Sequence, residues 1–253
     1  MSWTTSTLID PAGATAAAAS SAAAPVADPT GPAGAAADPA RRRATWALWG
    51  VVAGAAGLVA TMFTDQSGSL AEEDYLVGAA VVEKLESGPY HVGVVAGFVC
   101  VVALLFTAAG WRRWASHTAP DSLAARVVSM AMVASAGAMM IGYGLKGSMA
   151  VYLPGGMDHA QMSQDGLYAL FMFLDLGAWM VWWGGVVAAL AVVWLAFRER
   201  LLQRWIGVVS VLFAAVPLAF LTITGLPGMA AVTSIWLVVL SVGTVLRKRA
   251  TTA

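Results

Sequence analysis

The positions of the basic residues constrain the fold of this chain more than any other feature of the sequence. Twelve of its 14 Lys and Arg residues fall in four short clusters, and long apolar stretches lie around and between these clusters. An excess of Lys and Arg in short loops marks the cytoplasmic side of a membrane protein. The clusters lie at Arg41, Arg42 and Arg43; at Arg112, Arg113 and Arg126; at Arg198, Arg200 and Arg204; and at Arg247, Lys248 and Arg249.

The connections that alternate with these clusters hold only two basic residues, Lys84 and Lys146. The chain is therefore predicted to cross a membrane six times, with both termini in the cytoplasm. Only 11% of its residues are charged and 59% are apolar, which leaves too little polar surface for a soluble domain. Backbone groups inside a bilayer must pair within their own segment, so we expect an all-α, polytopic helical bundle.

The predicted location is the cytoplasmic (inner) membrane of a bacterium, with the lipid bilayer as the first partner. Basic residues are confined to the inner rim, so nothing in the charge pattern indicates nucleic acid. Residues 1–40 contain 15 Ala and 5 Pro but no Lys or Arg, and we expect a disordered cytoplasmic tail there. Residues 41–249 are predicted to form the six-helix domain, because each apolar stretch approaches the ~20 residues that a membrane-spanning helix needs. The spans are predicted at 45–64, 91–110, 124–145, 176–197, 205–224 and 229–246.

The long outer connection between the first two spans is predicted to contain an interfacial helix near residues 70–86. Its acidic residues lie mostly away from its apolar side, as suits a helix in the plane of the interface. The apolar side comprises Leu76, Val77, Ala80, Val81 and Leu85. On the inner side, the loop around Pro120, Asp121 and Ser122 is predicted to be the N-cap region of the third span.

Several polar residues are predicted to share one depth at the outer boundary. At ~1.5 Å per residue from the inner clusters, Asp65, His91, Lys146 and Asp175 all lie about 30–35 Å up their helices. Tyr90 lies at the same level. A lone charge in lipid is costly, so we expect Lys146 and Asp175 to approach each other. They would form either an ion pair that anchors two helices or, with His91, Tyr90 and Asp65, a polar vestibule that binds a small ligand or ion.

Single polar or aromatic residues near the spans are predicted to have structural roles. Trp179, Trp182 and Trp183 are expected in an interfacial aromatic belt, and Cys100 as a small buried residue. The hydroxyl groups of four residues are expected to bond back to their own helices. These four are Thr107, Ser129, Ser135 and Ser210.

Methionine is concentrated in one part of the chain, with nine of 12 between positions 130 and 180. Thioether and imidazole ligands together suit copper, especially Cu(I). Met157, His159 and Met162 in the outer loop are therefore a candidate copper site. The competing interpretation is that Met fills gaps between packed helices.

Motifs of catalysis are missing from the sequence, which has no HExxH, GxSxG or phosphate-cradling loop. We therefore expect a non-catalytic structural or regulatory membrane component. It would associate with a partner or with its own copies through Gly/Ala-rich helix faces. The pentapeptide GVVAG occurs twice, at 50–54 and 93–97, and its small residues are predicted to let helices pack closely. The alternatives are a membrane protein that binds a small ligand or copper at its outer face and, third, a transporter.

Three segments carry a resemblance to a known family. They are LESGPYHVG at 85–93, which leads into the second span; LFMFLDLG at 170–177; and LLQRWIG at 201–207, which opens the fifth. In their order, over roughly 45–246, the chain resembles the bacterial six-helix membrane family of the DUF4386-like group. The resemblance implies a six-helix architecture and brings no activity, substrate or cofactor.

Overall fold

A computed structural model describes residues 39–66, 78–159, 161–226 and 228–246, but not the side chains of residues 39–45, 175, 176, 178 and 228. The chain divides into two units, Met1–Ala37 and Asp38–Ala253, and all described residues belong to the second. Within these residues the regular structure is entirely helical, so the all-α prediction is confirmed. The predicted cytoplasmic tail lies outside the described residues except for Pro39 and Ala40, which begin α1 (Pro39–Leu58) rather than being disordered.

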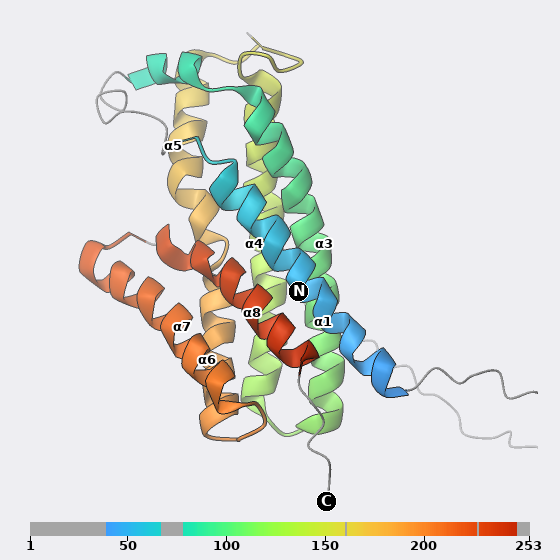
Figure 1. Ribbon diagram of the computed structural model, residues 1–253. Helices are drawn as coiled ribbons and strands as arrows, with labels where there is room; N and C mark the ends of the chain where they lie inside the picture. The colour runs from blue at the N-terminus through green and yellow to red at the C-terminus, as the bar shows by residue number, and fades with distance from the viewer. Residues whose placement is uncertain (1–38, 67–77, 160, 227, 247–253) are drawn as a thin grey trace, which may run out of the picture. The chain divides into compact units, whose positions relative to one another are not determined.

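Nine α- or 3₁₀-helical segments and one π-helix make up the described residues (Figure 1). In order they are α1 (Pro39–Leu58), the π-helix η1 (Val59–Phe63), the 3₁₀-helix η3 (Gly78–Lys84), α3 (Ser87–Thr118), α4 (Leu123–Tyr152), α5 (Gln164–Met180), α6 (Trp183–Phe197), α7 (Arg204–Thr224), the 3₁₀-helix η4 (Gly228–Val232) and α8 (Thr233–Val245).

Four helical stretches in the described residues are long and apolar enough to cross a membrane. They are Trp46–Phe63, Ser87–Thr118, Leu123–Tyr152 and Arg204–Thr224. The remaining two apolar helices, Trp183–Phe197 and Met229–Val245, are shorter than a full span. Each predicted span therefore overlaps an apolar helix, and four of these helical stretches reach spanning length, the first of them by combining α1 with η1.

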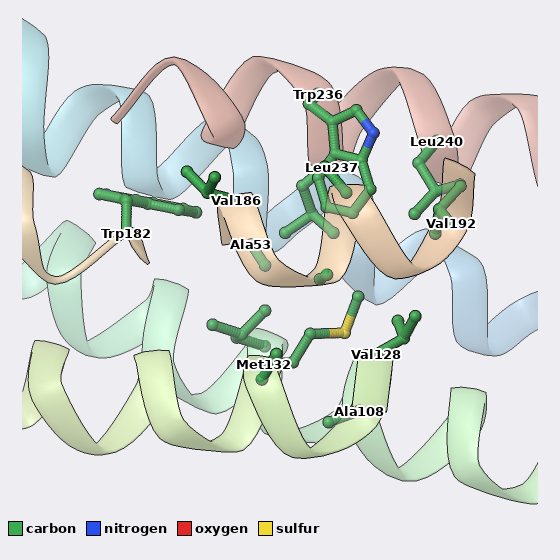
Figure 2. Close-up of a cluster of buried hydrophobic side chains, with 14 of the residues drawn as sticks. Ala53, Ala108, Val128, Met132, Trp182, Val186, Val192, Trp236, Leu237 and Leu240 are labelled. Atoms are coloured by element: carbon green, nitrogen blue, oxygen red, sulfur yellow. The ribbon is translucent and has the colours of Figure 1, made fainter. Parts of the chain in front are cut away.

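The helices pack in a bundle in which α3 and α4 run side by side over most of their length (Figure 1). α1 packs on α3 and on α8, while α6 packs on α4 and α7. Buried side chains from these helices form the larger of two apolar clusters, which we name the main cluster. Figure 2 shows part of it, with Trp182 at one end and Val192 and Leu240 at the other.

Trp111 ties three helices together within the main cluster. Its indole nitrogen donates a 3.0 Å hydrogen bond to the carbonyl oxygen of Ala125 at the start of α4. Its ring also meets Trp46 of α1 edge-on, with 6.0 Å between the ring centroids. Buried indole N–H groups need such a partner, so this pair of contacts fixes the α3–α4 end of the bundle against α1.

A second, smaller apolar cluster lies at the predicted outer end, and we name it the outer cluster. It joins η3, α5 and the adjoining ends of α3 and α4. Its buried members are Val81, Val82, Leu85, Tyr90, Met149, Leu153, Leu167, Phe171 and Leu174. η3 thus covers the end of the bundle by packing on α5.

The predicted interfacial helix near 70–86 is described only in its second half, and its position at the membrane interface stays a prediction. Residues 67–77 lie outside the described residues, and residues 78–84 form a 3₁₀-helix rather than an α-helix. With three residues per turn the buried side changes. Val82 is buried and Ala80 is exposed, although the sequence placed Ala80 on the apolar side.

The helix that contains residue 176, the predicted start of the fourth span, begins well before that residue. α5 begins at Gln164, where the Ser163 hydroxyl accepts a 3.2 Å hydrogen bond from the Gly166 N–H group. The helix continues because Leu167, Phe171 and Leu174 recur every three or four residues and enter the outer cluster. It is interrupted at Val181 and Trp182 before α6 begins.

Small residues allow close helix contacts inside the bundle. A side-chain carbon added to Gly54 would lie 2.5 Å from the Ser234 carbonyl oxygen of α8, and one added to Gly97 would collide with the Tyr143 ring of α4. The two GVVAG segments therefore both serve helix packing, as predicted, against different helices. The predicted N-cap is confirmed too, since the Ser122 hydroxyl accepts a 3.1 Å bond from the Ala125 N–H group.

Candidate functional site

Lys146 is the only charged side chain that is buried among the described residues, with 4% of its surface exposed. It lies on α4 between Tyr143, which belongs to the main cluster, and Met149, which belongs to the outer cluster. Lysine is almost never buried unless its ammonium group has partners. An ionisable residue inside a membrane helix is accordingly a candidate functional residue.

The hydrogen-bond partners of Lys146 lie in the π-helix η1, which follows α1, and directly after it. The Lys146 Nζ atom donates a 2.6 Å hydrogen bond to the Ala60 carbonyl oxygen and a 2.7 Å bond to the Thr64 hydroxyl. Thr64 in turn donates a 2.9 Å bond to the same Ala60 oxygen. Carbonyl groups near a helix end lose their usual backbone donors. Lys146 and Thr64 therefore supply the hydrogen bonds that the end of α1 lacks.

α3 closes the other side of this lysine. The Nζ atom lies 5.7 Å from the centroid of the buried Tyr90 ring, within the range of a cation–π interaction. A side-chain carbon at Gly93 would lie 2.6 Å from the Thr64 hydroxyl oxygen and 2.9 Å from Lys146 Cε. Only glycine at this position lets α3 approach so closely.

Asp65 supplies a negative charge beside this cluster. It follows Thr64 directly in the chain, and its carboxylate interacts electrostatically with the Lys146 ammonium group. We use the name lysine site for Ala60, Thr64, Asp65, Tyr90 and Lys146 together. The site brings three helices to one point, and the two oxygen atoms that accept hydrogen bonds from Lys146 come from the π-helix and the residue directly after it.

A second polar contact lies close to the lysine site and again involves the π-helix. The Thr61 hydroxyl lies 3.1 Å from the Tyr143 hydroxyl and accepts a 3.2 Å hydrogen bond from the Trp182 indole N–H group. Trp182 stands at the interruption between α5 and α6, and its carbonyl oxygen accepts a 3.3 Å bond from Thr233 at the start of α8. Buried hydrogen bonds therefore join three places: the π-helix after α1, the interruption between α5 and α6, and the start of α8.

The structure brings together three of the five residues predicted for the outer vestibule, namely Lys146, Tyr90 and Asp65. His91 is exposed, because neighbouring residues on a helix point about 100° apart and Tyr90 takes the inward direction. Asp175 lies inside α5, about 16 Å from its first residue rather than at the end of a span. The Asp175 side chain lies outside the described residues, so its ion pair with Lys146 stays a prediction.

The residues of the predicted copper site have different surroundings. Met157 is 93% exposed and His159 is also exposed. Met162 instead packs against the outer cluster, with its methyl group toward Gly166. This contact fits the gap-filling role of Met, and copper binding stays a prediction.

Sequence reasoning missed Thr61, Thr64 and Tyr143, and it assigned Trp182 to an aromatic belt, whereas Trp182 is 1% exposed. Hydroxyl groups within apolar spans were the available signal for the first three. The decisive partner, the carbonyl oxygen of Ala60, belongs to the backbone and has no signature in the sequence. Comparisons with family models, with curated proteins and with solved structures gave no match for this chain.

Proposed function

We propose that this chain is a six-span protein of the bacterial cytoplasmic membrane that acts as a non-catalytic structural or regulatory component. Its resemblance to the DUF4386-like family is part of the same proposal and adds architecture only. The observation that carries the proposal is the division of side chains between the surface and the interior of the bundle. Many large apolar side chains are exposed on the outside of the bundle, while most buried polar side chains have hydrogen-bond partners inside it.

The outward side of α3 illustrates this division. Val92, Val95, Phe98, Val102 and Phe106 recur every three or four residues and are each 50–55% exposed. A soluble monomer rarely exposes so extended an apolar surface. Lipid chains would cover this stripe, which supports a membrane location.

The two shorter apolar helices, α6 and α8, reach the length of a membrane span when the helical elements before them, α5 and η4, are included. η4 and α8 together comprise residues 228–245, which at ~2.0 Å per 3₁₀ residue and ~1.5 Å per α residue extend about 30 Å. This length equals the hydrocarbon thickness of a typical bilayer. α5 and α6 likewise follow one another after an interruption of two residues. Both combinations support six crossings.

The interior supports a role without catalysis. Lys146 uses its hydrogen bonds on the end of α1, and Thr61, Tyr143 and Trp182 bond to one another. These groups therefore act as connections between helices. A helix bundle fixed in this way suits a component that presents its surface to a membrane partner.

Cysteine labelling from the two sides of the membrane tests the six-span topology. Replacing the buried Cys100 with Ala gives a background without thiols, and single Cys residues are then placed at Pro120, Gly155, Gln203 and Gly225. We expect labelling by an impermeant reagent in intact cells at Gly155 and Gly225, and labelling of Pro120 and Gln203 only after lysis. Labelling of all four positions from one side, or of Pro120 and Gly155 from the same side, contradicts the proposed topology.

A further inference from the structure

The lysine site has the chemistry of a monovalent-cation site. A backbone carbonyl oxygen and a threonine hydroxyl lie 2.6 and 2.7 Å from the Lys146 Nζ atom. Carbonyl and hydroxyl oxygens are hard ligands that replace the hydration shell of small cations, and rings of carbonyl oxygens hold K⁺ in its channels. The adjoining Asp65 adds a negative charge, and the face of the Tyr90 ring adds a further attraction for a cation.

The position of these oxygens at a helix interruption is also typical of ion sites. Ala60 and Thr64 lie in and directly after the π-helix, where the regular α-helical hydrogen bonding of α1 ends. In membrane transporters, discontinuous helices offer their unwound carbonyl groups to cations in this way. Here the lysine reaches the oxygens from a different helix, α4, at a distance of 86 residues along the chain from Ala60.

We propose that the oxygen atoms around Lys146 form a monovalent-cation site that the tethered ammonium group itself occupies, and that free K⁺ takes its place when the ammonium group is removed. An ammonium ion and K⁺ are similar in size, so the same oxygen atoms suit both. Lys146 thereby holds the outer end of α1 against α3 and α4 without depending on the salt around the protein. The inference concerns one site and does not depend on the number of membrane crossings.

The test is thermal unfolding of the full chain in detergent, with KCl or choline chloride at equal concentration. Choline is too large for the site and keeps the ionic strength constant. The wild-type protein is expected to melt at the same temperature in both salts. Lys146→Ala is expected to melt roughly 5–15 °C lower in choline chloride, because it leaves buried polar groups without their partner. In KCl its melting temperature is expected to rise with the logarithm of the KCl concentration, as binding to the folded state requires.

Two matched variants locate the effect. Lys146→Met also removes the charge but fills the vacated space, so its melting temperature is expected to be the same in both salts. Lys84→Ala removes an exposed lysine from η3 and is expected to show no difference between the salts either. A KCl-specific rise in either control overturns the proposal, because K⁺ would then act elsewhere.

A more conservative substitution tests the proposal if Lys146→Ala does not fold in choline chloride. Lys146→Gln keeps a hydrogen-bond donor but removes the charge, and a weaker dependence on KCl is expected. Recovery of folded Lys146→Ala in KCl alone supports the proposal as well. Equal melting of the Ala variant in both salts overturns it, as does failure of both the Ala and the Gln variants to fold in either salt.

Discussion

Single residues show where sequence reasoning succeeds in this protein. Thr107, Ser129 and Ser210 were predicted to bond back to their own helices, and each does so with a carbonyl group three or four residues earlier. This pattern is local, so the sequence contains it. The exception is Ser135, which is buried without a hydrogen-bond partner among the described residues, in contact with the position where a side chain of Gly184 would lie. That contact depends on how α6 packs on α4, which no local pattern specifies.

Thr61 is expected to contribute more to stability than any of these locally bonded hydroxyl groups. Its oxygen serves both the Tyr143 hydroxyl and the Trp182 indole N–H group. Thr61→Val keeps the shape but leaves two buried groups without this partner, which costs about 1–3 kcal/mol each. We expect the melting temperature in detergent to fall by roughly 4–24 °C, at about 2–4 °C per kcal/mol for a chain of this size.

Thr107→Val is the matched control for this change. Thr107 is as deeply buried as Thr61, but its hydroxyl donates only to Ala103 on its own helix. Its replacement is expected to shift the melting temperature by less than about 2 °C. An equal fall in melting temperature in the two variants would contradict this expectation. It would show that the bonds of Thr61 to Tyr143 and Trp182 contribute no more than a hydroxyl group bonded to its own helix.

Most apolar helices were located correctly from the sequence, while several of their ends were not. The fourth span was predicted to begin at residue 176, directly after Asp175. α5 passes through this position because Leu167, Phe171 and Leu174 pack in the outer cluster. The π-helix at 59–63 and the interruption at 181–182 were not predicted either. Both depend on contacts between segments far apart in the chain.

The end of α6 offers a test at the scale of a helix. The chain leaves this helix through Arg200, whose φ of +54° lies in the left-handed region, while the Leu201 N–H group donates a 2.9 Å bond to the Leu195 carbonyl oxygen. Glycine adopts this conformation without the steric cost that other residues have. Arg200→Gly is therefore expected to stabilise the protein by about 0.5–1 kcal/mol, a rise of roughly 1–4 °C in melting temperature.

Arg198→Gly separates this backbone effect from the loss of charge. Arg198 belongs to the same basic cluster but has a φ of −88°, which suits any L-residue. Glycine there only adds freedom to the unfolded chain, so the melting temperature is expected to fall. Shifts of the same sign in both variants would mean that the charge, and not the left-handed conformation, determines the result.

At the scale of the whole molecule, the pattern of charged and apolar residues predicted the all-helical architecture, and each predicted span overlaps an apolar helix, but most of α5 was not predicted. It did not predict which helices pack together, because apolar faces of similar composition do not specify their partners. The candidate site was found only in part for the same reason. The depth of each residue along its helix correctly placed Asp65, Tyr90 and Lys146 at one level. Depth does not specify the direction in which a side chain points from the helix axis, and His91 points away from Lys146 into an exposed position.

The proposed association with a membrane partner can be tested on α4. The glycines of the two GVVAG segments are occupied by contacts within the chain. Gly137 and Gly144 are exposed and seven residues apart on one side of α4, and no described atom lies within 4 Å of a side-chain carbon built at either. Small residues at such spacing let another helix approach. Gly137→Leu with Gly144→Leu is expected to remove the partner or the second copy that co-purifies in mild detergent.

The mass of the protein–detergent complex and a pull-down measure this association. Ala109→Leu makes the same kind of change at an exposed position of α3 and is expected to leave the association intact. A wild-type protein that purifies alone as a monomer contradicts the proposed role. An association that persists in the double variant excludes this side of α4 as the surface that mediates it.

The contact between α1 and α8 has a consequence for the biosynthesis of the protein. α1 packs, through Gly50 and Gly54, on Ser241, Ser234 and Val238 of α8. Because translation proceeds from α1 towards α8, this glycine surface of α1 stays without its neighbour while the helices between them are synthesised. The contact can form only after α8 has left the ribosome, and a product truncated before residue 233 contains an α1 without its native counterpart.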